Sequence, residues 1–280
     1  MQSTITITAD DFGLTRGVTD TILETVDKGP VTHVGLIPNG EAVNYAIEEY
    51  KKRSERLTLT AHLNLTEGLA LSPVSDIPFL VDSAGNFKYG VIGLWIAYSI
   101  AGSKMQLHFR EQVRREIIAQ LVCIREASGL IEIIVNSHQH VHLIPFVFDE
   151  LVKLPGITRI RTAREPYQWS WSPISIFARK VLILLSDRAT YTMRPYGITT
   201  NDSFIGFMHS GHMTQKIFHA ALDKADGSIE ASFHPGSAAR DELVSWQGGR
   251  ANIAWHYSSW RTKERAMLLH PGFITHPRSR

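Results

Sequence analysis

Short apolar runs alternate with longer amphipathic segments along this chain. Strand-like runs rich in β-branched residues occupy 4–8, 31–37, 56–65, 131–135, 157–161 and 228–233. Helix-like segments occupy 15–29, 41–53, 103–127, 146–154, 213–224 and 260–269, and their apolar positions recur at helical spacing. The alternation predicts an α/β fold with a parallel sheet and helices outside it. An open doubly wound sheet and a closed barrel both fit this pattern.

Polar residues follow most of the predicted strands at the point where each strand ends. A parallel barrel carries its reactive groups at this edge, where the βα loops begin. No G-x-G-x-x-G sequence follows the first strand, which disfavours a dinucleotide-binding fold. We therefore expect one polar site at the carboxyl edge of the sheet. Its candidate members are Asp10, Asp11, His62, Asn64, Asn136, His138, His140, His142, Arg161, Glu165 and His234.

Composition narrows the class of protein. The 280 residues are 44% hydrophobic and 20% charged, which permits a sizeable core. The formal net charge of +2 gives no argument for nucleic-acid binding. The single cysteine, Cys123, excludes an internal disulfide framework and a cysteine-rich zinc site. The N-terminal residues lack the pattern of a signal peptide, so we expect a cytoplasmic protein. Its oligomeric state is left open.

Two segments are unusually apolar for a protein surface, residues 91–102 and 172–186. Neither approaches the roughly 20 residues that a membrane span requires. We expect core helices or lid helices at these positions. The alternative is an interfacial surface that contacts lipid or an apolar substrate, peripheral to the inner face of a membrane.

The stretch NSHQHVHLIP (136–145) places three histidines at alternating positions. In an extended chain, alternate positions share one face, so two or three imidazoles would converge. Gln139 and Val141 would then point away from the site. Histidine is a common ligand of metal ions. The alternative is a set of ordinary surface histidines.

Asp10 and Asp11 can both face this site, because the chain turns where the first strand ends. Two carboxylates there would repel each other unless a cation lies between them or one is protonated. One carboxylate and two imidazoles leave coordination positions open, as in catalytic metal sites. The second aspartate could then act as a base on a metal-activated water, with His234 as an acid or oxyanion stabiliser. Alternatively, one aspartate caps the helix that begins near Thr15.

Four motifs together, TADDFGLT, AHLNLTEG, NSHQHVHLIP and HPG, resemble the motif set of the YdjC-like carbohydrate deacetylases (the ChbG/HpnK group). They occur in the same order and cover the chain from Asp10 to His234, whereas the C-terminal 40 residues carry no such motif. The resemblance implies a TIM-like (β/α) barrel of seven or eight strands with helical insertions, in one domain over residues 1–280. It also implies removal of an N-acetyl group from an amino sugar with one divalent metal ion.

The resemblance also assigns roles by motif. Asp11, His62 and His138 would be the metal ligands, Asp10 the general base and His234 the general acid.

Other residues take weaker assignments. His140 and His142 would support the ligands or contact the substrate, and Arg161 and Glu165 are further candidates on a loop that contains an arginine in the family. The family usually shows SHHHVH where this chain has Gln139. We expect this difference to matter little, because the residue should face away from the site.

The sequence specifies the metal ion and the substrate less closely than the site residues. Two imidazoles favour Zn²⁺, Co²⁺ or Ni²⁺ over Mg²⁺, with Zn²⁺ expected. The substrate would be an N-acetylated amino sugar or glycan. Residues 71–90 and the apolar helix after them resemble the hopanoid-associated branch of the family, so a lipid-linked glycan is included. Two other classes stay open: another barrel metal hydrolase, such as a phosphoesterase or amidohydrolase, and a non-catalytic carbohydrate-binding relative.

Overall fold

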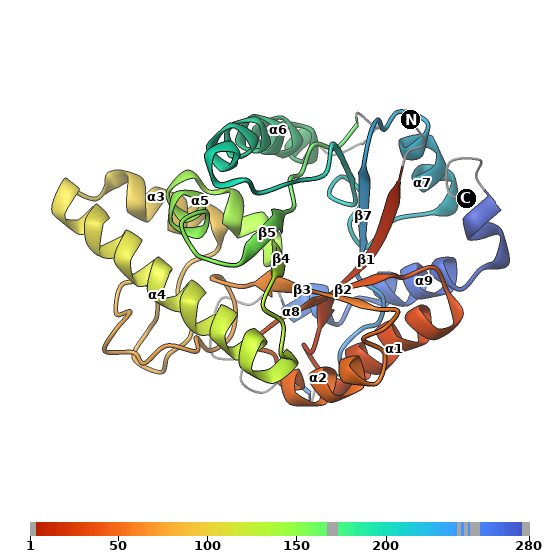
Figure 1. Cartoon of the computed structure of the whole chain (residues 1–280), viewed down its shortest axis with the longest axis horizontal. Helices are drawn as coiled ribbons and strands as arrows, with labels where there is room; N and C mark the ends of the chain where they lie inside the picture. Colours follow the sequence, from red (N-terminus) through yellow and green to blue (C-terminus); the bar gives the residue numbers. More distant parts are fainter. Residues whose placement is uncertain (1–3, 167–172, 240–241, 244–245, 247–252, 276–280) are drawn as a thin grey trace.

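The fold is built on one curled sheet of parallel strands (Figure 1). The computed structural model describes residues 4–166, 173–239, 242–243, 246 and 253–275. Within them the strand order is β5-β4-β3-β2-β1-β7-β6, and every neighbouring pair is parallel, as the alternation of elements predicts. The strands are β1 (Ile5–Phe12), β2 (His33–Leu36), β3 (Thr58–Leu63), β4 (Ile133–Ser137), β5 (Ile157–Ile160), β6 (Ser203–Ile205) and β7 (Ile229–Phe233).

The sheet curls until its two edges approach each other. Arg161, just after β5, reaches across the interior and donates hydrogen bonds to Asp10 of β1 and Glu230 of β7. At the edge, one parallel bridge joins Arg159 of β5 to Thr199, ahead of β6. The prediction of an α/β fold with seven or eight strands is confirmed, and the sheet has seven. The predicted barrel is confirmed only as a curled sheet, because β5 and β6 do not pair as strands within the described residues.

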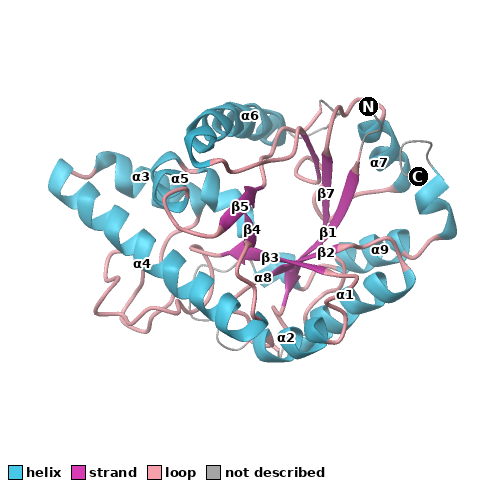
Figure 2. Cartoon of the chain, viewed as in Figure 1, coloured by secondary structure: helices cyan, strands magenta, loops and turns pink. Residues whose placement is uncertain are grey.

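Helices cover the outside of the curled sheet (Figure 2). The predicted helices are all observed, and α6 continues beyond residue 186. Strand β6 was not predicted, because three residues are too few to show a periodicity. The helices are α1 (Arg16–Lys28), α2 (Val43–Lys51), α3 (Val91–Ile100), α4 (Ser103–Ser128), α5 (Pro145–Leu151), α6 (Pro173–Met193), α7 (Gln215–Leu222), α8 (Ile253–His256) and α9 (Ser259–Leu268), with short 3₁₀ helices η1 (His138–Leu143), η2 (Arg194–Tyr196) and η3 (Pro271–Thr275).

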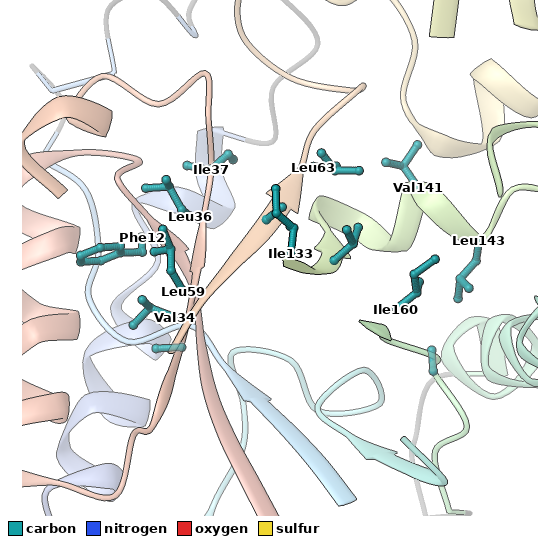
Figure 3. Packing of buried hydrophobic residues seen from close by; sticks show 14 of the residues in the cluster. Phe12, Val34, Leu36, Ile37, Leu59, Leu63, Ile133, Val141, Leu143 and Ile160 are labelled. Atoms are coloured by element: carbon teal, nitrogen blue, oxygen red, sulfur yellow. The ribbon is translucent and has the colours of Figure 1, made fainter. Parts of the chain in front are cut away.

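The strands alternate apolar and polar residues, and this alternation separates the core from the site. In β3, Leu59 and Leu63 belong to the hydrophobic core (Figure 3). Thr60 and His62 lie on the opposite face, since successive side chains of a strand point to opposite sides. Strands β1 and β7 follow the same rule. The interior of the curled sheet is therefore polar, and its buried members include Thr8, Asp10, Thr60, His62, Asn136, Glu230 and Ser232.

The N-terminal cap of α1 shows whether Asp10 or Asp11 caps this helix. Thr15 is the N-cap of α1, and its hydroxyl accepts a hydrogen bond from the backbone N–H of Val18. Asp10 and Asp11 are both buried in the sheet. Neither aspartate therefore caps this helix.

The apolar segments are not core helices. In α3 only Leu94 is buried, while Ile92, Ile96 and Ile100 are 74%, 54% and 80% exposed. Helix α6 exposes Phe177 by 69%, and Ser172 lies outside the described residues. None of the helices in the described parts of the chain is long and apolar enough to cross a membrane.

Candidate active site

A pocket lies at the carboxyl ends of the strands, where the sequence predicts a polar site. Its volume is about 340 Å³. It brings together Asp10, His62, His138, His140 and His234, which follow or end four different strands. The other lining residues are Ser137, Gln139, Phe204, Gly206, Phe207, Ser210, Ser232 and Trp255.

Asp11 lies beside the pocket, at the end of β1, where the strand is distorted. Its φ is +69°, and the register of β1 against β2 shifts beside it, which turns it to the same side as Asp10. Its Oδ2 accepts a hydrogen bond of 2.7 Å from Arg261. Its Oδ1 lies 3.5 Å from both His62 Nε2 and His138 Nδ1. This oxygen has no hydrogen-bond partner among the described residues.

These three side chains fit a metal ion. All are buried, and their ligand atoms lie within 4.8 Å of one another. Two ligand atoms on one tetrahedral Zn²⁺ lie about 3.3 Å apart, because each is about 2.0–2.1 Å from the ion. The 3.5 Å spacings in this cluster are close to that value. The donor set and the unpaired oxygen of Asp11 are therefore suited to hold a metal ion.

The electrostatics also favour positive charge here. Burial opposes a charge on His138, but the carboxylates of Glu67 and Asp11 raise its pKa to about 10. A proton or a metal ion can satisfy this preference. On His62, either end of the Asn136 amide can face Nδ1, 2.8 Å away. Only the amide oxygen would accept an N–H from Nδ1 and leave the Nε2 lone pair for a metal ion.

Asp10 is held rigidly beside this cluster. Arg161 donates two hydrogen bonds to its carboxylate, of 2.6 and 3.1 Å, and the Ser232 hydroxyl donates a third of 2.5 Å. Burial alone would raise the pKa of Asp10, but the positive charge and the hydrogen bonds of Arg161 hold it well below the usual range. Asp10 is therefore ionised at neutral pH and presents its carboxylate to the pocket.

The histidine run is not extended, so the expectation that alternate residues share a face is wrong. Strand β4 ends at Ser137, and the run forms η1, in which Gln139 and His140 have φ of +52° and +53°. Two left-handed residues in succession fold the chain back and rotate each side chain differently. With Asp11, they are the only non-glycine residues of the described chain with positive φ. Backbone strain of this kind collects at functional sites.

The position of Gln139 differs most clearly from the prediction. Gln139 lines the pocket and donates a hydrogen bond of 2.6 Å to Oε1 of Glu67. The prediction that it faces away from the site is wrong, because that prediction assumed a strand.

His140 and His142 have different environments. His140 lines the pocket, and its ring stands edge-on to Phe204 with centroids 5.2 Å apart. His142 is buried, with Nδ1 2.5 Å from the Ser137 hydroxyl and Nε2 2.8 Å from the carbonyl of Arg161. Burial lowers the pKa of His142 to about 4. His142 therefore braces the loop, and His140 faces the pocket.

His234 enters the pocket from the loop after β7. Its backbone N–H donates a 2.7 Å hydrogen bond to Glu264, and its Nδ1 lies 3.5 Å from the hydroxyl of Ser210. Burial lowers the pKa of His234 to about 4. The resting imidazole is therefore neutral at pH 7.

Arg161 and Glu165 do not line the pocket. The guanidinium of Arg161 is taken up by Asp10 and Glu230. The carboxylate of Glu165 accepts three backbone N–H bonds, from residues 206, 207 and 208. Burial raises the pKa of Glu165 to about 7. Both side chains are occupied within the protein, and Glu165 fixes a loop that forms one wall of the pocket.

Residues of the C-terminal segment also contribute to the site, although no motif in the sequence points to them. His256 Nε2 lies 2.8 Å from Glu67 Oε2, and Arg261 and Glu264 contact Asp11 and the loop of His234. Arg261 and Glu264 could have been found from the sequence, because they share the buried face of α9 with Leu268. Charged residues at such positions need buried partners.

Comparison with known proteins agrees with the motifs. The profile of the YdjC-like protein family matches residues 4–276. The chain is 30% identical to a carbohydrate deacetylase of Mus musculus over 251 residues, 87% of this chain and 77% of that protein. It is 30% identical to a carbohydrate deacetylase of Homo sapiens over 249 residues, 83% of this chain and 74% of that protein.

Two further similarities concern bacterial proteins. A carbohydrate deacetylase of Oceanobacillus iheyensis is 34% identical over 150 residues, 54% of this chain and 60% of that protein. A crystal structure from Enterococcus faecalis, of a protein named for cellobiose-phosphate cleavage, superposes with a TM-score of 0.69 at 21% identity. It covers 100% of this chain and 96% of its own, and at this identity it supports the fold alone. With the family profile spanning nearly all of its length, the chain belongs to the YdjC-like family.

Proposed function

We propose that this chain is a metal-dependent carbohydrate N-deacetylase that acts as one unit over residues 1–280. It would hydrolyse the N-acetyl group of an amino sugar or glycan and release acetate and a free amine. The observation that carries the proposal is the ionised Asp10 in the pocket, beside the ligand atoms of Asp11, His62 and His138. Relatives named carbohydrate deacetylase support the same class of reaction.

Asp11, His62 and His138 would hold one divalent ion. Two imidazoles favour zinc, with cobalt, nickel and magnesium as alternatives. An ion bound there would acidify a water molecule and polarise the acetamide carbonyl.

Asp10 and His234 would move the protons. The low pKa of Asp10 makes it a weak base, so it accepts a proton only from a strongly acidified donor. Arg161 and Ser232 fix the direction of its oxygens. His234 is neutral at rest, because burial lowers its pKa to about 4. It can donate an N–H hydrogen bond to the substrate. The proton that Asp10 takes from the water would pass to His234, which would then give it to the leaving amine as the C–N bond breaks.

The pocket suits a neutral sugar better than a phosphate ester. Among the described residues that line it, there is no lysine or arginine. The nearby Arg161 and Arg261 are both bonded to carboxylates. Phe207 and Trp255 give the wall apolar aromatic surface. These features favour a deacetylase over a phosphoesterase, which needs cations around the phosphoryl group.

The test is acetate release from N-acetylglucosamine oligomers. Asp10→Asn should lower turnover by about 10²–10⁴-fold while the bound metal, counted by elemental analysis, stays the same. Asp20→Asn on the exposed face of α1 is the matched control and should leave turnover unchanged. Near wild-type turnover in the Asp10 variant would refute its role as base. A metal-loaded protein that releases no acetate from any acetylated amino sugar would refute the activity.

We also propose that the glycan is lipid-linked and that the protein works in the cytoplasm at the inner face of a membrane. The support is the apolar surface of α3, with Ile92, Ile96 and Ile100 exposed, and that of α6, with Phe177 and Leu184 exposed. Surfaces of this kind insert into the interfacial region of a bilayer. In liposome co-sedimentation we expect binding, and Ile96→Glu should reduce it. No sedimentation of the wild-type protein at low salt would remove the lipid part and leave deacetylation untouched.

A further inference from the structure

Glu67 lies behind the histidine cluster and contacts three side chains with its carboxylate. Its Oε2 is 3.3 Å from His138 Nε2 and 2.8 Å from His256 Nε2. Its Oε1 accepts a 2.6 Å hydrogen bond from Gln139. Glu67 is only 1% exposed. None of the roles proposed above for the reaction uses it.

His138 stands between two carboxylates, one at each ring nitrogen. Its Nδ1 faces Asp11 Oδ1 at 3.5 Å, on the side of His62. Its Nε2 faces Glu67. An imidazole that binds a metal ion through one nitrogen carries a hydrogen on the other. A carboxylate beside that second nitrogen fixes which nitrogen keeps the hydrogen, and it makes the ligand nitrogen more basic.

We propose that Glu67 is a positioning residue that holds the Nε2 hydrogen of His138 and leaves Nδ1 as the metal ligand. The inference rests on the metal site of the proposed function. His256 and Gln139 complete the arrangement by fixing the two oxygens of Glu67. This gives the glutamine that replaces the family's usual histidine a specific role, as one of the donors that orient the carboxylate.

A second metal ion held by Glu67, His138 and His256 is the competing arrangement, since these ligand atoms also lie within 4.8 Å of one another. The distance between Glu67 and His256 favours a hydrogen bond over two ligands of one ion. The 2.8 Å between Glu67 and His256 is that of an ordinary N–H···O bond. Both oxygens of Glu67 already accept hydrogen bonds within the protein.

The first test is the zinc affinity of the full chain, measured by titration calorimetry with zinc alone. Glu67→Gln should weaken the affinity about 10- to 100-fold, with a stoichiometry of one ion in both proteins. Glu116→Gln is the matched control. Glu116 is also a buried glutamate and accepts backbone N–H bonds from Leu71 and Ser72, away from the site. Its variant should bind zinc as the wild type does.

The second test is ¹⁵N NMR of the zinc-loaded protein with labelled histidine. We expect His138 to carry its hydrogen on Nε2, and this hydrogen should exchange with water at least tenfold faster in Glu67→Gln. A purely structural role would leave this signal unchanged. If Glu67→Gln does not fold, His256→Gln replaces it, with the same direction of effect and a smaller size.

Three results would overturn the inference. They are zinc affinity and exchange in the variant within about threefold of wild type, a His138 hydrogen on Nδ1, or two zinc ions in the wild type and one in Glu67→Gln. The failure of the proposed function gives a different result. A protein that binds zinc with this dependence on Glu67 but releases no acetate keeps the inference and loses the activity.

Discussion

Arg261 of α9 donates a 2.7 Å hydrogen bond to Oδ2 of Asp11 in β1, across 250 positions of the chain. Both side chains are fully buried. The contact neutralises one oxygen of Asp11 and leaves the other facing His62 and His138. The last helix therefore completes the site that the first strand begins.

Replacing Arg261 should destabilise the fold as well as the site. Arg261→Met keeps much of the volume but leaves the Asp11 carboxylate buried without its partner. We expect the free energy of unfolding to fall by about 3–5 kcal/mol. Urea unfolding followed by circular dichroism measures this change.

The matched control is Arg265, one turn further along α9. It pairs with Glu24 on the surface, where its side chain is 37% exposed. Solvent screens that pair, so Arg265→Met should cost about 1 kcal/mol or less. If the two variants lose the same free energy of unfolding, burial does not make the Arg261–Asp11 pair contribute more to stability than the surface pair.

Gly35 of β2 leaves the space in which Asp10 and His62 meet. A Cβ at this position would lie 2.6 Å from Asp10 Oδ1 and 3.2 Å from His62 Nδ1. Gly35→Ala must therefore displace both side chains. We expect turnover to fall at least 10-fold, on the order of what a 1 Å displacement costs, with a stability loss of about 1–3 kcal/mol.

Gly93 provides the comparison, because its Cβ would meet nothing closer than 3.7 Å. In the helix interior of α3, Gly93→Ala should raise stability by about 0.4–1 kcal/mol and leave turnover unchanged. Turnover and thermal unfolding, measured side by side, distinguish the two glycines. Full activity in Gly35→Ala would contradict the close packing of Asp10 and His62.

The last two histidines of the run, His140 and His142, should differ in their effects on stability and on kinetics. His142→Ala removes two buried hydrogen bonds, to Ser137 and to the carbonyl of Arg161, and should cost about 2–4 kcal/mol. His140→Ala should cost about 1 kcal/mol or less and raise KM, because His140 lines the pocket. Urea unfolding and Michaelis kinetics measure both. The assignment fails if His140→Ala is the more destabilised variant.

Glu165 should make stability depend on pH. Burial raises its pKa from 4.5 to about 7, so the folded chain holds this proton more tightly than the unfolded chain. The contribution is fully present below pH 4.5 and is lost as pH rises through about 7. We expect this loss to be on the order of 1–3 kcal/mol. Glu165→Gln removes the titration, so its unfolding free energy should vary less than that of wild type between pH 5 and 8.

Urea unfolding at pH 5, 6, 7 and 8 gives the two profiles. Glu48→Gln, on the exposed face of α2, is the control and should follow the wild type. Parallel profiles for wild type and Glu165→Gln would mean that Glu165 binds its proton equally in both states.

The strands and helices could be predicted because their signals are local. Alternation with a period of two marks β1, β3 and β7, and helical spacing marks α4. The parallel direction follows from the alternation of the two kinds of element. Polar residues at strand ends then had to meet at one edge, which is why Asp10, His62, His138 and His234 are found in one pocket.

The shape of the histidine run could not be predicted in this way. Its residues alternate as a strand would, but left-handed backbone at Gln139 and His140 breaks the strand. Such a conformation costs energy locally and persists only because the surrounding contacts hold it. The position of Gln139 against Glu67 therefore belongs to the tertiary structure.

By itself, the sequence determined the class of fold, the order of its elements and the polar residues at the strand ends, because these depend on spacings of a few residues. Only the tertiary structure decided that the sheet curls without complete pairing of its edges. It alone brought His256 to Glu67 and Arg261 to Asp11. Contacts between residues about 190 and 250 positions apart leave no periodic trace in the chain, and they exist because buried charges must find partners once the sheet has curled.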